Sequence, residues 1–296
     1  MHHSGFVNII GRPNVGKSTL MNAMVGEKMS IITNKPQTTR HRIIGIVSKP
    51  ESQIVFSDTP GIISDPAYKM QEAMNRFVAS TFEDADLMLF VTDTLEKYEE
   101  DDPIITRLKR VKIPLFLLIN KTDLSTPDQI LKRIQWWNDK VDFKETIPIA
   151  AINAKNVDTV LKLIVDMLPE GPVYYPKDQL TDRNERFFIS EIIREKILLF
   201  YHQEIPYSCE VMVTNFKHSK TNAGAPIVRI AATIFVARDS QKNILIGKGG
   251  SAIKKLGAAA RKDMEAWLDS KVFLEMHVKV KNNWRDDDRM LKHFGY

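Results

Sequence analysis

The stretch Gly11-Arg12-Pro13-Asn14-Val15-Gly16-Lys17-Ser18 decides the fold of this chain. Its spacing, Gly-x4-Gly-Lys-Ser, places successive backbone N–H groups around an anion at the start of a helix, where the helix dipole favours negative charge. An apolar run precedes it at residues 6–10, and residues 18–25 have the character of a helix. A strand, a glycine loop and a helix in this order predict a phosphate-binding loop.

Two side chains of this loop carry the chemistry of phosphate binding. Lys17 would reach the β and γ phosphates of a nucleotide, and the Ser18 hydroxyl would coordinate magnesium. A plain glycine turn is the competing interpretation, and the flanking strand and helix make it the weaker one.

The apolar runs that follow the loop alternate with helical segments. The runs lie at residues 53–56, 87–92, 114–119 and 146–150, and the helical segments at 68–81 and 127–137. Alternating β and α units imply a mostly parallel sheet covered by helices on both faces. We therefore predict a three-layer α/β domain around the phosphate loop.

The chain has 296 residues, which is enough for two domains with a core each. A polar, proline-bearing stretch from 169 to 182 interrupts the pattern and is typical of a linker. We predict a nucleotide domain at residues 1–169, a linker at 170–182 and a second domain at 183–296.

Composition and charge narrow the class of protein. Hydrophobic residues make up 43% and charged residues 27%, as in an ordinary globular protein. No apolar run has the length of a membrane span and no signal peptide is evident, so we expect a cytoplasmic protein. Residues 183–296 carry 20 Lys and Arg against 13 Asp and Glu, while the remainder carries 22 against 24. The basic second part suggests a polyanionic partner, although such a face is more often merely solvated.

Two further motifs follow predicted strands. In Asp58-Thr59-Pro60-Gly61, the carboxylate of Asp58 would lie near the water shell of magnesium, and the Gly61 N–H would lie near the γ-phosphate. In Asn120-Lys121-Thr122-Asp123, Asp123 would accept hydrogen bonds from guanine N1 and N2, which adenine does not offer. Asn120 would hold the loops together, and the Lys121 stem would cover the base.

Together these residues resemble the Ras-like P-loop GTPases over about residues 5–168. The resemblance implies that a threonine of the first switch loop, within residues 36–42, completes the magnesium shell; Thr39 is our first choice and Thr38 the second. It implies magnesium ligands Ser18 and Thr39, with Asp58 bound through water. It implies the catalytic residues Lys17, Thr39, Asp58 and Gly61. It implies nucleotide contacts from Gly11, Asn14, Val15, Gly16, Lys17, Ser18, Thr19, Asp58, Gly61, Asn120, Lys121, Asp123 and Ala151.

Three positions depart from that pattern or add to it. Ile62 stands where Ras-type proteins carry a water-orienting glutamine, so we expect slow intrinsic hydrolysis. Alanine replaces a usual serine at Ala150, beside Ala151, in a loop that contacts the base mainly through its backbone. Similar GTPases with asparagine at the position of Asn14 use a potassium ion against the phosphates. A simple turn cap by Asn14 is an equally supported alternative.

The sequence of the second domain predicts a different fold. We expect helices at 185–201, 243–246 and 251–268, strands at 209–216, 228–236 and 272–280, and a short tail helix at 286–294. The order α, β, β, α, α, β predicts a small α+β domain.

A glycine turn joins two of these helices. Gly247-Lys248-Gly249-Gly250 lets the backbone approach phosphates, the lysines add charge, and nearby isoleucines can floor a groove for unstacked bases. Gly-x-x-Gly alone is a weak signal; core packing of the isoleucines and solvation of the lysines are the alternatives. The candidate RNA contacts are Ile246, Gly247, Lys248, Gly249, Gly250 and Lys254.

This second part resembles a type II KH domain over about residues 183–282. A Ras-like GTPase followed by one KH domain, with Gln-Thr-Thr-Arg-His-Arg at 37–42, is identified as a member of the Era family of bacterial GTPases. The resemblance implies GTP and magnesium, binding of 16S rRNA near its 3′ end, a role in small-subunit assembly and some contact with the inner membrane surface.

Two other functions stay open at this point. One is a tRNA-modification or other ribosome-associated GTPase, although the single phosphate loop disfavours a double GTPase. The other is a metabolic P-loop kinase, which the guanine-reading motif at 120–123 disfavours.

Overall fold

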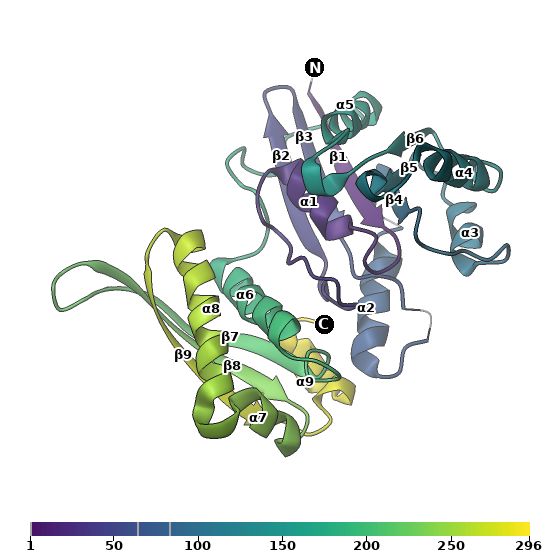
Figure 1. Cartoon of the computed structure of the whole chain (residues 1–296). Helices are drawn as coiled ribbons and strands as arrows, with labels where there is room; N and C mark the ends of the chain where they lie inside the picture. Colours follow the sequence, from purple (N-terminus) through teal and green to yellow (C-terminus); the bar gives the residue numbers. More distant parts are fainter. Residues whose placement is uncertain (1, 64, 83) are drawn as a thin grey trace. The chain divides into compact units, whose positions relative to one another are not determined.

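The computed structural model describes residues 2–63, 65–82 and 84–296 (Figure 1). The chain forms two compact units. Of the described residues, one unit holds 2–63, 74–82 and 84–182, and the other holds 65–73 and 183–296. Residues 170–182 belong to the first unit, where the Leu180 carbonyl accepts a hydrogen bond of 2.8 Å from the Ile46 N–H. The Gln53 carboxamide also binds the backbone of Tyr174 and Tyr175.

The first unit is built on a six-stranded sheet with the order β2-β3-β1-β4-β5-β6. The strands are β1 (His3–Ile10), β2 (Ile43–Lys49), β3 (Ser52–Asp58), β4 (Leu87–Asp93), β5 (Leu115–Asn120) and β6 (Glu145–Pro148). All neighbours are parallel except β2 and β3. The predicted mostly parallel α/β sheet is therefore confirmed.

Helices connect these strands. They are α1 (Lys17–Val25), α2 (Lys69–Ser80), α3 (Pro103–Leu108), α4 (Pro127–Asn138) and α5 (Val157–Met167), with short 3-10 turns η1 (Thr122–Leu124) and η2 (Ala151–Asn153). The sequence analysis did not identify β2, α3 or α5. Helix α4 begins with a capping box, in which the Thr126 hydroxyl accepts from the Gln129 N–H, and a cap of this kind satisfies N–H groups that lack an intrahelical partner.

The core positions the carboxyl ends of the central strands at one edge of the sheet. Every residue of β4 and β5 is buried, because parallel strands are covered on both faces. Trp137 of α4 is fully buried and packs edge-on against Phe90, with ring centroids 4.7 Å apart. The register pairs Asp93 with Asn120 where these two strands end, so their polar side chains emerge together.

The second unit has a three-stranded sheet with the order β7-β8-β9. Its elements are α6 (Glu185–Phe200), β7 (Cys209–Lys220), β8 (Pro226–Val236), α7 (Asp239–Ile246), η3 (Lys248–Gly250), α8 (Ser251–Leu268), β9 (Lys271–Val280), η4 (Trp284–Asp286) and α9 (Asp288–Phe294). The predicted α+β order is confirmed. The β7–β8 hairpin is longer than expected and extends past α8 (Figure 1).

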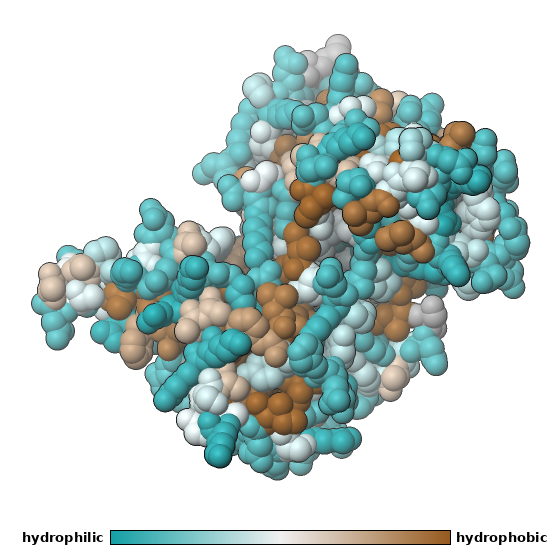
Figure 2. Space-filling view, viewed as in Figure 1, coloured by the Kyte–Doolittle hydropathy of each residue, from teal (hydrophilic) through white to brown (hydrophobic). Residues whose placement is uncertain are grey.

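The visible surface is largely hydrophilic, with hydrophobic residues in small groups (Figure 2). Among the described residues, no helix combines the length and apolar character needed to cross a membrane.

Candidate functional site

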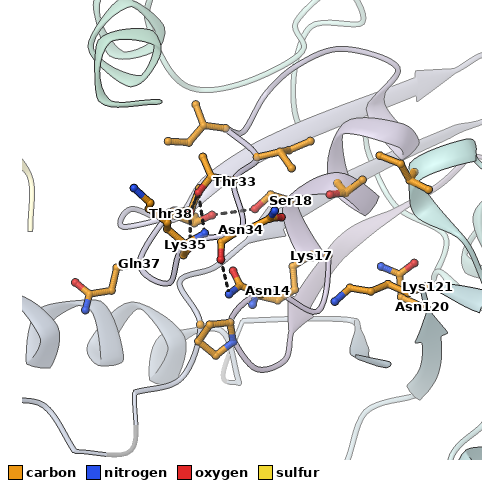
Figure 3. Close-up of a pocket in the computed structure, with 18 of the residues that line it drawn as sticks. Asn14, Lys17, Ser18, Thr33, Asn34, Lys35, Gln37, Thr38, Asn120 and Lys121 are labelled. Atoms are coloured by element: carbon orange, nitrogen blue, oxygen red, sulfur yellow. Dashed lines mark hydrogen bonds between the residues drawn. The ribbon is translucent and has the colours of Figure 1, made fainter. Parts of the chain in front are cut away.

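The phosphate loop, the first switch loop and the end of β5 enclose a cavity of about 510 Å³ (Figure 3). Most of the residues predicted to bind the nucleotide line this cavity. Those that line it are Asn14, Gly16, Lys17, Ser18, Thr19, Thr39, Gly61, Asn120, Lys121 and Asp123. The remaining predicted nucleotide contacts, Gly11, Val15, Asp58 and Ala151, are not among the residues that line it.

The backbone of the phosphate loop requires glycine at two places. Gly16 has φ +97°, and a Cβ added there would lie 2.2 Å from Nδ2 of Asn120. Gly11 has φ +152°, and a Cβ there would lie 2.3 Å from the carbonyl oxygen of Val91. Since real Cβ atoms do not approach so closely and positive φ disfavours other residues, the loop keeps its path only with glycine.

Lys17 is buried under this loop. Its Nζ donates to the carbonyl oxygens of Gly11 (3.0 Å) and Arg12 (2.8 Å). Burial lowers the pKa of Lys17 to about 8, although the nearby Asp58 and Glu96 carboxylates oppose that shift. The lysine is thus a desolvated cation that phosphate oxygens would stabilise.

Three oxygen-bearing side chains meet where magnesium is expected. The Ser18 hydroxyl lies 2.9 Å from the Thr39 hydroxyl and donates to Oδ2 of Asp58 at 2.7 Å. Burial raises the pKa of Asp58, and its Oδ1 is buried without a hydrogen-bond partner among the described residues. Hard oxygen ligands around a desolvated carboxylate fit Mg²⁺. Thr38, the second choice, instead donates to the Lys35 carbonyl at 2.6 Å.

Asn120 links two loops beside the expected base position. Its Nδ2 donates to the Val15 carbonyl at 2.8 Å, and its Oδ1 accepts from the Ala151 N–H at 3.0 Å. Asp123 lies at the rim of the cavity and its carboxylate makes no hydrogen bond or ion pair with any residue that the structure describes. An acceptor that is not engaged elsewhere is available to a base.

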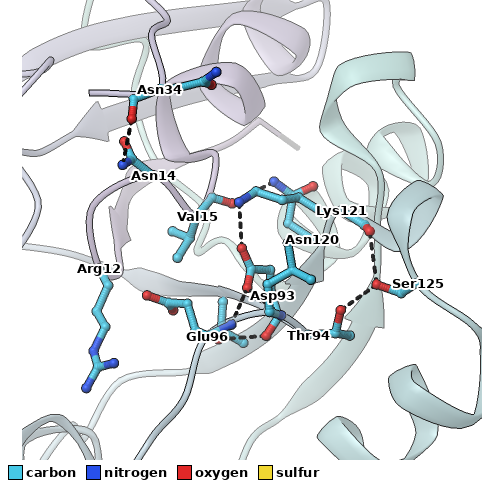
Figure 4. A network of polar contacts seen from close by, with 12 residues as sticks. Arg12, Asn14, Val15, Asn34, Asp93, Thr94, Glu96, Asn120, Lys121 and Ser125 are labelled. Carbon is cyan, nitrogen blue, oxygen red and sulfur yellow. Dashed lines mark hydrogen bonds and ion pairs between the residues drawn. The ribbon is translucent and has the colours of Figure 1, made fainter. Parts of the chain in front are cut away.

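Asp93, which the sequence analysis did not identify, contacts the loop at 120–123 that is predicted to bind guanine (Figure 4). Its Oδ2 lies 2.6 Å from Nζ of Lys121, and its Oδ1 accepts from the N–H groups of Leu95 and Glu96. Since Asp93 ends the strand next to the one that Asn120 ends, its place at the same sheet edge was a signal in the sequence.

Arg12 is held by the loop between β4 and α3. Its guanidinium pairs with Asp102, donates to the Lys97 carbonyl at 2.7 Å and lies 4.1 Å from the centre of the Tyr98 ring. Asp102 also caps α3 by accepting from the Ile104 N–H. The phosphate loop is therefore fixed from outside the cavity, by residues about 90 positions away that no local motif identifies.

Asn14 and Ile62 have contacts of different kinds. The Asn14 amide donates to the Asn34 carbonyl of the switch loop at 3.1 Å, so it faces that loop (Figures 3 and 4). Ile62 packs against the hydrophobic core that contains Trp137. The isoleucine therefore has a packing role at the position where a glutamine would orient water.

The Gly-x-x-Gly segment of the second unit also has a glycine-dependent backbone. Gly247 has φ +72°, and a Cβ there would lie 2.6 Å from Cβ of Ala252. Gly249 (φ +60°) and Gly250 (φ +77°) have open space at the Cβ position. Gly250 precedes α8 and offers no side chain to cap it, while the Ser251 N–H at the start of that helix donates to the Lys248 carbonyl inside the turn. The positive end of the helix dipole nevertheless lies at this turn and favours an anion there.

Side chains around this turn have the predicted polarity. Lys248 and Lys254 are exposed, and Ile244 is 55% exposed. Ile246 is half-buried, while Leu245 is fully buried in the core. The surface beside the glycine turn thus combines cations with an exposed apolar side chain, as single-stranded RNA sites do.

Comparison with known proteins decides the family. A family model described as 50S ribosome-binding GTPase matches residues 6–121, and a KH-domain model matches residues 204–285. "GTPase ERA1, chloroplastic" of Zea mays is 45% identical over 298 residues, covering 100% of this chain and 71% of that protein. The chain belongs to the Era family of GTPases. "GTPase ERA-like, chloroplastic" of Oryza sativa is 46% identical and is covered to 70%.

Two solved Era structures share the whole architecture of this Era-family chain. Era of Aquifex aeolicus, as a single-residue variant bound to GDP·AlF4⁻, is 35% identical, with a TM-score of 0.92 and 99% of each chain covered. Era in complex with MgGDPNP and nucleotides 1506–1542 of 16S rRNA is 36% identical, with a TM-score of 0.93 over 100% of this chain and 99% of that one. The protein is thus an Era-type GTPase with a C-terminal KH domain.

Proposed function

We propose that this GTPase is a nucleotide-controlled RNA-binding switch, which binds small-subunit rRNA near its 3′ end and assists assembly of that subunit. The observation that supports this proposal is the similarity to the structure of Era in complex with MgGDPNP and a 16S rRNA fragment, because the similarity extends over the full chain. GTP would order the switch loops, hydrolysis would release them, and RNA affinity would change between the two states.

In the nucleotide site, each residue has a proposed role. Lys17 holds the β and γ phosphates, Asp123 selects guanine, and Asn120 keeps the two loops in place. Mg²⁺, held by Ser18 and Thr39 with Asp58 acting through water, would neutralise charge on the phosphates. Ile62 supplies no group that orients water, so hydrolysis is slow and serves as a timer.

We also propose a potassium ion beside Asn14. Nδ2 of Asn14 donates to the Asn34 carbonyl at 3.1 Å, which places the carboxamide beside a backbone oxygen of the switch loop. A cation shared with the phosphates would replace this hydrogen bond and take the Asn14 and Asn34 oxygens as ligands. Hydrolysis is expected to be about tenfold or more faster in potassium than in sodium buffer, since a cation there stabilises developing charge. Phosphate release at equal ionic strength measures this. Equal rates in both buffers would leave Asn14 as a turn cap.

In the second unit, Gly247, Gly249 and Gly250 would receive RNA phosphates, helped by Lys248 and Lys254, while Ile246 contributes to the floor of the groove. Gly249→Asp is expected to weaken RNA binding about tenfold, most visibly at low salt, because it places negative charge beside the RNA backbone. The fold should survive, since aspartate tolerates the left-handed conformation and the site is open. Unchanged RNA affinity in a fluorescence titration would contradict this site.

The test of the whole proposal is recovery of RNA. GTP-loaded and GDP-loaded protein, each with Gly249→Asp as control, is used to capture cellular RNA for sequencing. Enrichment of the 3′ end of small-subunit rRNA by wild type alone is the expected result. Enrichment of tRNA would favour a tRNA-modification GTPase instead, and phosphorylation of a small molecule would favour a kinase.

We propose a cytoplasmic location with peripheral contact to the inner membrane; two of the relatives are named as chloroplastic proteins.

A further inference from the structure

The sheet of the second unit has two faces with different surroundings. On one face, alternate residues of β8 belong to the hydrophobic core, together with residues of α6 and α8; they are Val228, Ile230, Ala232, Ile234 and Val236. The intervening residues of β8 point to the opposite face, because side chains alternate along a strand. This opposite face is not needed for the core.

The C-terminal tail covers one end of that opposite face. The ring of Phe294 in α9 lies 5.1 Å from the ring of Phe235, and the Tyr296 hydroxyl donates to Oε2 of Glu210 at 2.7 Å. Trp284 is fully buried and donates to the Ser208 carbonyl at 3.1 Å. The tail is therefore anchored where β7 begins and β8 ends.

The other end of this face bears a row of cationic and aromatic side chains. The register places Lys217 of β7, Arg229 of β8 and Phe273 of β9 side by side. Phe273 is 50% exposed, and the Arg229 guanidinium lies 5.5 Å from the centre of its ring. Lys271 lies two residues before Phe273 on the same face. We name these four residues the open sheet end.

The cations of the open sheet end are not neutralised by the protein. Lys217, Arg229 and Lys271 are exposed, and none of them forms an ion pair with any residue in the described part of the chain. The nearest acidic residue along β9 on this face, Glu275, is bonded to His277 at 2.9 Å. A large exposed aromatic ring among unpaired cations favours a polyanion that also carries flat rings.

We propose that the open sheet end is a second RNA-binding surface, in which the three cations contact phosphates and Phe273 stacks with a base. The proposal rests on the proposed RNA-binding function. A KH loop clamps about four nucleotides, whereas the RNA in the Era complex comprises nucleotides 1506–1542. Most of an RNA of that length lies outside the groove.

The position of the open sheet end fits such an RNA. The glycine turn precedes α8 and Lys271 follows it, and α8 has 18 residues. At 1.5 Å per residue, the helix separates the two places by about 27 Å. The open sheet end also lies on the face of the sheet opposite α8, because residues of α8 pack in the core with the alternate residues of β8. The nucleotides clamped at the glycine turn therefore do not reach it, and the second surface would act only on longer RNA.

The test compares RNAs of two lengths. The probes are an RNA with the sequence of nucleotides 1506–1542 and a single strand of about four nucleotides from its 3′ part, the number that a KH loop clamps. The double variant Lys217→Ala/Arg229→Ala is expected to bind the longer RNA about tenfold more weakly. The plot of log association constant against log salt concentration should become less steep by about 1.4, because two phosphate contacts are lost. Phe273→Ala should weaken that binding several-fold with an unchanged slope.

Binding of the short strand should be the same in all of these variants. The charge-matched control is Arg261→Ala/Lys262→Ala, which removes two exposed cations of α8 and should leave both affinities unchanged. Thermal melting checks that each variant is folded.

Four outcomes would overturn the proposal. Wild-type affinity of the variants for the longer RNA would exclude the surface, and equal weakening for both RNAs would show that the effect passes through the groove. If wild-type protein bound neither RNA, the proposed function itself would fail. If Gly249→Asp weakened binding of both RNAs while the sheet variants bound both with wild-type affinity, the proposed function would stand without this second surface.

Discussion

Asp123→Asn is expected to weaken GTP binding by about three orders of magnitude and to shift the preference of the site toward xanthosine nucleotides. Guanine presents two donors, at N1 and N2, and a carboxylate accepts from both. An asparagine has one acceptor and one donor, which matches the N1–H and 2-oxo groups of xanthine. Sites built to hydrogen-bond a substrate group discriminate by about 10⁴ to 10⁵ when the match is lost. Because the asparagine oxygen would still accept from N1–H, the loss expected for GTP is smaller, about three orders of magnitude.

In the structure, this substitution should affect base binding without affecting the fold. Asp123 is exposed at the rim of the cavity and is not engaged by other described residues, so the change should not disturb the fold. Competition of GTP, XTP and ATP against a fluorescent nucleotide measures the preference. Lys121→Ala is a useful comparison, because it should weaken all guanine and xanthine nucleotides without switching between them. Retained GTP selectivity in Asp123→Asn would show that the base is read elsewhere.

Lys17→Ala is expected to weaken GDP and GTP binding by about 30-fold to a few thousandfold. Removing one partner of a buried, hydrogen-bonded charge pair costs about 2–5 kcal/mol, and the phosphates would lose their closest buried cation. Lys17→Arg keeps the charge but not the compact ammonium, so it tests geometry separately. Isothermal titration gives both affinities, and an unchanged value in Lys17→Ala would place the phosphate site elsewhere.

The pH profile of GDP affinity identifies Lys17 as the source of the effect. In the free protein its pKa is about 8, and bound phosphates would raise that pKa. Below pH 8 the lysine is charged in both states, so affinity is flat. Above pH 8 binding requires proton uptake, and affinity falls by up to tenfold per pH unit. Lys17→Ala should lack this fall, while any titration of guanine itself remains.

Much of the fold followed from patterns that are local in the sequence. The glycine loop lies between a strand and a helix, and buried runs such as residues 87–92 are confirmed as parallel strands. Strand β2 was missed because it joins the sheet antiparallel, outside the alternating β and α order. The predicted hairpin strands were too short, since the polar residues 217–220 lack the apolar alternation of a half-buried strand.

The first switch loop shows where sequence reasoning stops. Thr38 and Thr39 are adjacent and chemically identical, so no pattern separates them. In the structure the Thr39 hydroxyl lies 2.9 Å from that of Ser18, while Thr38 is bonded to Lys35. The direction of each side chain depends on how the loop folds over the phosphate loop, which is a tertiary property.

The sequence by itself determined the kinds of chemistry available to this protein. The motifs are each short, because each uses consecutive backbone groups or one side chain beside them: the phosphate loop at 11–18, the segment at 120–123 predicted to bind guanine, and the glycine turn at 247–250. Such motifs can be identified from the sequence without knowledge of the fold.

Only the tertiary structure decided which distant residues support those motifs. Arg12 is held by Asp102 and Tyr98, and Lys121 by Asp93, through contacts between residues 28 to 90 positions apart. The row of Lys217, Arg229 and Phe273 exists only through the strand register. These arrangements depend on how separate segments pack, and packing is a property of the whole core rather than of any one stretch.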